Sequence, residues 1–128
     1  MKPYEQIPMP NGLTVEVYDL SRQIADDTVR VEMMIRIPVT LRPDDFTEPL
    51  QFEQTCAVFG KEIVYEHRLE RSFVGREQKN DVFRTLLKTF KQASLPYLSN
   101  PKFRNRLAAS KHREILQNPY KYRTRQDG

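Results

Sequence analysis

The chain has 128 residues, a mass of 15.2 kDa and a formal net charge of +4, a size at which one domain can bury a core. The longest apolar run covers residues 56–59 and residues 1–5 hold no apolar segment, so we expect no membrane-spanning helix and no secretory signal. The single cysteine allows no intramolecular disulfide, and the composition predicts a soluble, cytoplasmic protein that does not bind membranes.

The charge is unevenly distributed along the chain. Residues 1–60 carry 5 basic and 10 acidic side chains, whereas residues 61–128 carry 16 basic and 7 acidic ones. Such a division occurs where two halves pack together with complementary charge, and also where a basic surface receives an acidic partner. The first explanation is the commoner one, because helices usually carry charge on their solvated face.

Two stretches near the start alternate between apolar and polar residues, as half-buried strands do. They cover residues 13–19 and 28–39, and the polar link between them predicts an antiparallel hairpin with a longer loop. Residues 1–12, which contain several prolines, predict an extended lead-in. Tyr18 and Met34 fall on the polar faces of these strands, so we expect an exposed apolar spot that suits a dimer contact.

The middle of the chain predicts a loop, a short helix and a third strand. Residues 40–49 form the loop, and Phe52, Cys56 and Phe59 give the helix over residues 50–59 one apolar stripe. Gly60 stands where a left-handed cap usually ends a helix. Residues 62–74 alternate again and predict the third strand.

Two further helices follow the third strand. Residues 76–93 repeat apolar side chains with the helical period, and Pro96 is expected to end this helix. Asn100 as cap and Pro101 at the first helical position predict a last helix that runs to about Leu116.

The order β-β-α-β-α-α predicts an α+β fold. We expect a three-stranded, mainly antiparallel sheet with the helices packed on one face. The predicted organisation is a single domain over residues 1–118 and a basic tail over residues 119–128.

Few residues form a catalytic or metal-binding pattern. Cys56 lies in an apolar stripe and is interpreted as a buried structural cysteine. His67 shares a strand face with Tyr65, which predicts a histidine at the edge of the core or, alternatively, a small-ligand pocket or enzyme site. His112 lies on a basic helix and is expected to be solvated.

Metal and cofactor chemistry is not expected. The histidines lack metal-ligand spacing, and the carboxylate pairs at residues 26–27 and 44–45 are typical of turns and caps. The four glycines lie too far apart for a phosphate-binding loop. The sequence therefore predicts no cofactor and no metal, and favours a protein that is not an enzyme.

The basic C-terminal region carries the strongest functional pattern. Lys102, Arg106 and Arg113 stand at i, i+4 and i+11, one stripe of the last helix. The tail then mixes aromatic and basic residues, a composition that neutralises phosphates and stacks on bases. The candidate nucleic-acid-binding residues are Lys102, Arg106, Arg113, Tyr120, Lys121, Tyr122, Arg123 and Arg125.

The sequence resembles no family from which an activity can be inferred. Residues 52–73 and 95–101 resemble segments of small bacterial proteins of unassigned function. The favoured hypothesis is a small, non-enzymatic, partner-binding domain whose partner is another protein or a second copy of the chain. The first alternative is nucleic-acid binding through the basic helix and tail. The second is a ligand pocket or enzyme site near His67.

Overall fold

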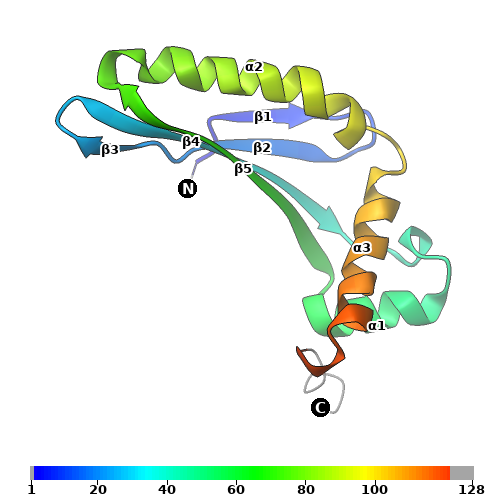
Figure 1. Cartoon of the computed structure of the whole chain (residues 1–128). Coiled ribbons are helices and arrows are strands. Elements are labelled where there is room, and N and C mark those ends of the chain that lie inside the picture. The colour runs from blue at the N-terminus through cyan, green and yellow to red at the C-terminus, as the bar shows by residue number, and fades with distance from the viewer. Residues whose placement is uncertain (1, 122–128) are drawn as a thin grey trace. The chain divides into compact units, whose positions relative to one another are not determined.

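The computed structural model describes residues 2–121 of the chain (Figure 1). The described residues form two compact units, the first made of residues 2–37 and 65–100, the second of residues 38–64 and 101–121. The single domain over residues 1–118 stays a prediction. The fold is α+β with an antiparallel sheet, as predicted.

The sheet has five strands, not the three predicted. Its strands are β1 (Glu5–Pro8), β2 (Thr14–Asp19), β3 (Arg22–Ala25), β4 (Thr28–Thr40) and β5 (Glu62–Gly75). β4 pairs antiparallel with both β2 and β3, β1 pairs antiparallel with β2, and β5 pairs with β4. The element order β-β-β-β-α-β-α-α therefore replaces the predicted β-β-α-β-α-α.

The two strands that sequence reasoning missed are short and lack the signals of a buried strand. β1 lies in the predicted lead-in and ends at Pro8, and its residues are half-buried or exposed. All four residues of β3 are exposed, so no alternation marks it. Both strands exist because each pairs with a longer neighbour, β2 or β4.

A tight turn joins β1 to β2. The Met9 N–H donates to the Leu13 carbonyl at 2.8 Å, and the Gly12 N–H donates to the Met9 carbonyl at 3.0 Å. Gly12 has a φ of +85°, which a side chain at this position would strain. The Asn11 amide donates to the carbonyl of Leu98 at 2.9 Å and so ties the turn to the end of helix α2.

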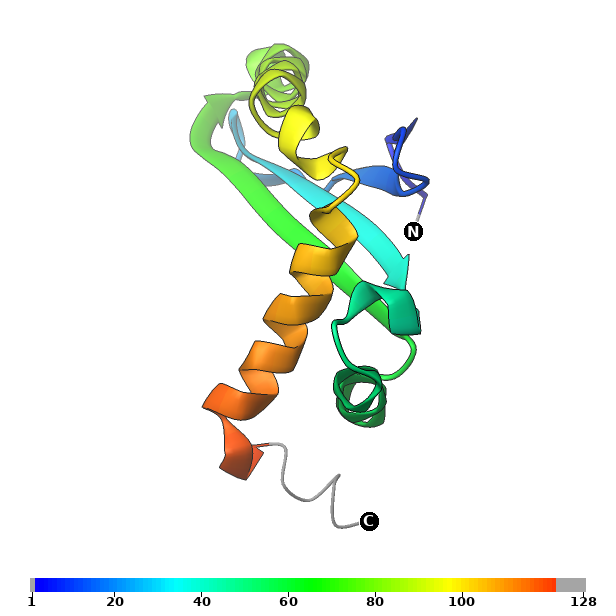
Figure 2. The same cartoon turned by 90° about the vertical axis from the view of Figure 1, so that its right-hand side faces the viewer.

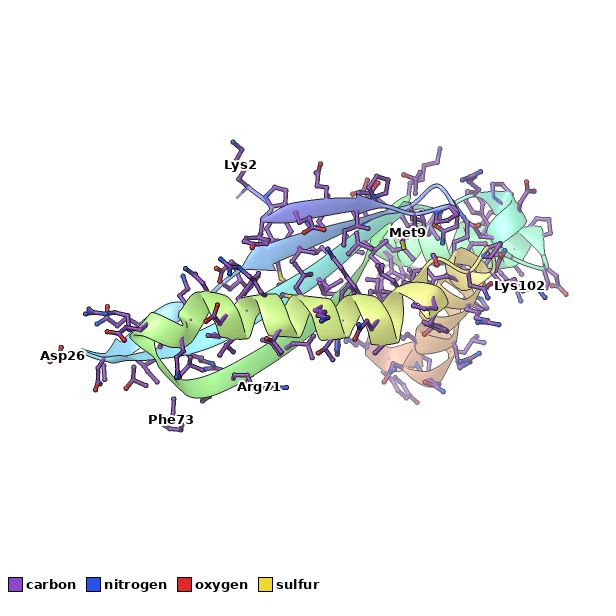
Figure 3. All side chains as sticks on the ribbon, turned by 90° about the horizontal axis from the view of Figure 1, so that it is seen from above. Lys2, Met9, Asp26, Arg71, Phe73 and Lys102 are labelled. Atoms are coloured by element: carbon purple, nitrogen blue, oxygen red, sulfur yellow. The ribbon has the colours of Figure 1, made fainter. Side chains whose placement is uncertain are left out.

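Helix α2 (Lys79–Leu98) lies along one face of the sheet (Figures 1 and 3). Its buried side chains include Phe83 and Phe90. The centres of the Phe83 and Tyr4 rings lie 4.8 Å apart. Pro96 does not end this helix, contrary to the prediction. The helix continues to Leu98, which is 1% exposed, because burial of this side chain outweighs the hydrogen bond that Pro96 cannot donate.

Tyr18 and Met34 lie on the opposite face of the sheet. The prediction that they form an exposed apolar spot is wrong. These two residues are direct neighbours in the β2–β4 register and are buried, 7% and 8% exposed. The Tyr18 hydroxyl donates to Glu16 at 2.9 Å, and this bond with burial raises the pKa of Tyr18. Arginine and glutamate side chains of the neighbouring strands form ion pairs over this face.

β5 loses its regular alternation at its end. Phe73 has a φ of +58°, and this break leaves Phe73 83% exposed while Val74 is buried. His67 is also exposed, so it does not lie at the edge of the core as predicted. The alternating pattern of the sequence therefore predicts the strand but not its buried face.

The second unit holds the short helix η1 (Pro43–Asp45), α1 (Pro49–Phe59) and α3 (Phe103–Gln117) (Figure 2). α3 begins at Phe103, with Lys102 as the capping position, and not at Asn100-Pro101. In α1 the buried residues are Thr55 and Val58. The predicted apolar stripe of α1, including Cys56, is only half-buried, because the face turned inward is rotated by one position along the helix.

Candidate functional site

An ion pair fixes the start of α3 against η1. The Arg104 guanidinium binds both carboxylate oxygens of Asp45, at 2.7 and 3.1 Å, and also donates to the Thr40 carbonyl at 2.7 Å. The Asp45 side chain is 4% exposed and the Arg104 side chain 13%. A bidentate ion pair fixes the relative orientation of its two groups as well as their distance. This pair therefore holds α3 in one orientation next to η1.

The Asp45 carboxylate also closes the turn in which it lies. One of its oxygens accepts the Arg42 backbone N–H at 2.8 Å. Burial alone would raise the pKa of Asp45, but the hydrogen bonds from Arg104 and from the Arg42 backbone lower it below its ordinary value. The predicted role of this carboxylate pair in a turn or cap is thus the role that Asp45 performs.

Two contacts join α3 to α1. His112 Nε2 lies 2.8 Å from Gln54 Oε1, and the Lys111 ammonium lies 5.2 Å from the centre of the Phe59 ring. His112 is 9% exposed, so its predicted solvation is wrong. His112 lies on the same buried face of α3 as Ala108 and Ile115, which are four residues before it and three residues after it.

These contacts leave an open groove of about 620 Å³ within the second unit. One wall includes Phe46, Thr47 and Gln51, from the segment that runs from η1 into α1. The other wall is α3, and it includes Lys102, Arg106 and Arg113. The structure therefore brings the three predicted stripe residues into the lining of a single groove.

The α3 wall combines positive charge with apolar surface. Ala109 and Leu116 lie between and beyond the three cations, at positions that complete the same helical stripe. Leu116 is 64% exposed, and Phe46 is a further apolar residue of the groove lining. Sequence reasoning missed both apolar residues, although the spacing of Leu116 from Lys102, i+14, would have placed it on the stripe.

The remaining candidate nucleic-acid residues lie at the end of the described chain. Tyr120 is 85% exposed and Lys121 is exposed. Tyr122, Arg123 and Arg125 lie outside the described residues. Nucleic-acid binding by this set stays a prediction.

Tyr65 and His67, the candidate ligand-pocket pair, lie in the first unit. Tyr65 is half-buried, and burial followed by the neighbouring Tyr97 raises its pKa. His67 is exposed, and neither residue lines the groove of the second unit. A ligand site at this pair also stays a prediction.

Cys56 has the environment of a structural thiol. It is half-buried, and burial raises the pKa of its thiol, which opposes formation of the nucleophilic thiolate. Among residues 2–121, no cluster of three His, Cys, Asp or Glu side chains is placed to hold a metal ion. No helix in the same range has the length and apolar character needed to cross a membrane.

Comparisons with protein-family models, with curated proteins and with solved structures give no match.

Proposed function

We propose that this protein is a non-enzymatic binding domain whose groove between η1–α1 and α3 receives an acidic segment of a partner protein. The observation that carries the proposal is the shared lining: Lys102, Arg106 and Arg113 lie along the same groove as exposed Leu116. A partner that presents carboxylates and one apolar side chain would match both features. The single cysteine and the absence of a spanning helix in residues 2–121 support a cytoplasmic location.

Two acids, Asp44 and Asp45, also line the groove. Asp45 is already neutralised by Arg104, whose guanidinium lies on its carboxylate. Asp44 is exposed at one end of the lining, whereas the cations extend over three turns of α3. The lining thus contains more basic than acidic side chains, a composition that suits an anionic segment.

The apolar wall favours a peptide over a nucleic acid as the partner. Leu116 and Phe46 offer contacts for an aliphatic side chain, which a phosphate backbone lacks. Nucleic-acid binding is the second candidate, because Tyr120 is exposed directly after α3 and can stack on a base. The two candidates differ in salt dependence: each phosphate contact contributes about one unit of log–log slope.

The test is fluorescence anisotropy with a labelled peptide of glutamate, leucine and serine. At about ten residues it spans roughly 33 Å when extended, more than the length of α3 at about 22 Å. We expect saturable binding that weakens about tenfold or more in Arg106→Glu and Arg113→Glu, because each reverses a charge on the groove wall. Lys88→Glu, which makes the same charge change on α2, is the matched control.

Two further probes complete the test. A peptide with lysine in place of glutamate should not bind. Single- and double-stranded oligonucleotides of mixed sequence are titrated at low and moderate salt. Steeply salt-dependent oligonucleotide binding without peptide binding would replace the proposal with the nucleic-acid function, and flat titrations with every probe would overturn both.

A further inference from the structure

β5 is an outer strand of the sheet in the first unit. Within residues 2–121 its strand neighbour is β4. Residues 66–73 of β5 are exposed except Leu69, which is half-buried. An outer strand of this length offers backbone N–H and C=O groups to a further strand.

Phe73 is an unusual residue to expose at the end of such a strand. It is 83% exposed and holds a φ of +58°, a conformation that a bulky side chain adopts only at a cost. Figure 3 shows Phe73 projecting outward from β5, on the side away from α2. An exposed aromatic ring held at a conformational cost indicates a contact that the single chain does not supply.

An open hollow of about 520 Å³ lies beside this edge, between β5 and α2. Its lining includes Val74 of β5 and Val82 and Leu86 of α2, so its floor is apolar. Arg71 and Ser72 line it on the strand side. A strand added to β5 would place side chains next to this hollow.

The charges on β5 are arranged so that the strand complements itself. Glu70 pairs with Arg30 of β4, and Arg68 pairs with Glu32 of β4 at 3.0 Å. If a second β5 runs antiparallel with Leu69 facing Leu69, each Arg68 faces Glu70 of the other copy. The two rows that run through Arg68 and Glu70 then alternate in sign across the joined sheets, and opposite charges on facing residues stabilise a sheet.

The neighbouring registers lack this complementarity. In a pair of antiparallel strands, two residues that face each other have their side chains on the same face of the sheet. In a dimer with a two-fold axis normal to the sheet, one residue of β5 therefore faces the same residue of the other copy, at the axis. An axis through Arg68 would set Arg68 against Arg68, and one through Glu70 would set Glu70 against Glu70. The axis through Leu69 avoids both repulsions.

We propose that a second copy of this chain docks antiparallel along β5, with the two-fold axis at Leu69, so that the two sheets join into one. The contact uses residues 65–73, all of them in the first unit, and it is independent of the groove in the second unit.

The first test measures the mass of the full chain by sedimentation equilibrium over micromolar to sub-millimolar concentrations. We expect a monomer–dimer equilibrium. Glu70→Arg, which sets arginine against Arg68 in both symmetric pairs, should raise the dimer dissociation constant about tenfold or more. Glu66→Arg is the matched control: it also reverses a glutamate paired with an arginine of β4, at 3.5 Å, but in the proposed register it faces the neutral Ser72.

A charge exchange then identifies the register. Arg68→Glu and Glu70→Arg should each be largely monomeric alone, whereas their mixture should form a mixed dimer because the facing charges are opposite again. A dimer that persists in both single variants, or a mixture that stays monomeric while the parent chain dimerises, would overturn the proposal. A parent chain that is monomeric throughout the concentration range would overturn it as well.

Phe73→Asn provides a test that does not depend on tolerance of reversed charges. Asparagine adopts positive φ more readily than phenylalanine, so the monomer should melt at the same or a higher temperature. The dimer should nevertheless weaken, because the exposed ring lies at the end of the paired segment and a second copy docked there would cover part of its apolar surface. An unchanged dimer dissociation constant in this variant would contradict a contact that extends along β5 as far as residue 73.

Discussion

In the first unit the charged side chains of β4 and β5 form alternating pairs on the sheet surface, whereas in the second unit one ion pair is buried and other cations line a groove. Arg30 and Glu70 keep 32% and 49% of their side-chain surface exposed, while Asp45 and Arg104 keep 4% and 13%. Ion pairs thus contribute differently in the two units. Exposed pairs are screened by water and contribute little, whereas removal of one partner from the buried pair leaves an uncompensated charge.

The largest expected effect compares these two pairs directly. Arg104→Met leaves the buried Asp45 carboxylate without its ion-pair partner, and we expect a loss of about 3 kcal/mol in the free energy of unfolding. Arg30→Met removes one of the exposed pairs, and its loss should be much smaller because water and salt screen this pair. Urea denaturation followed by circular dichroism measures both losses, and equal values would show that burial does not separate the two units.

The dependence of the free energy of unfolding on acidic pH tests the role of the buried pair. Because the folded state lowers the pKa of Asp45, its contribution is fully present above the unfolded pKa of about 3.9 and is lost as the pH falls through the lower, folded value. We therefore expect the stability difference between the parent chain and Asp45→Asn to be constant above about pH 5 and to shrink below about pH 4. The effect should be smaller than that of Arg104→Met.

Hydrogen exchange locates this loss within the molecule. On acidification to below about pH 4, amides of α3 should lose protection before those of α2, because the Asp45 carboxylate holds the start of α3 through Arg104. Comparable protection of both helices, after correction for the intrinsic pH dependence of exchange, would contradict the assignment.

Local periodicity predicted those features that depend on neighbouring residues. The alternation over residues 28–39 predicted β4, and the spacing of Lys102, Arg106 and Arg113 predicted one stripe of a helix. Both patterns follow from the geometry of a strand and a helix, which repeats within a few residues.

Features that depend on distant residues could not be predicted in this way. Asp45 and Arg104 are 59 positions apart, and His112 is buried because Gln54, 58 positions away, lies against it. β3 has no buried residue, so only its pairing with β4 makes it a strand. The positive φ of Phe73 reverses the faces of β5 in a sequence that continues to alternate.

The smallest predicted effect separates backbone conformation from charge in the first unit. Gly12→Ala forces a side chain onto a residue with φ of +85° and should cost about 1 kcal/mol, although the added methyl group meets no atom within 4 Å. Gly75 has a φ of −61°, and a methyl group there would meet Gln78 at an ordinary 3.5 Å. Gly75→Ala should therefore be neutral or slightly stabilising.

Thermal and urea unfolding of the two alanine variants give the comparison. If the Gly12→Ala loss exceeds that of Arg30→Met, the β1–β2 turn, which the Asn11 amide joins to the end of α2, matters more to the first unit than an exposed ion pair on its sheet. The opposite ranking would mean that the row of alternating charges on β4 and β5 acts cooperatively, since an isolated exposed pair contributes too little to exceed a strained turn.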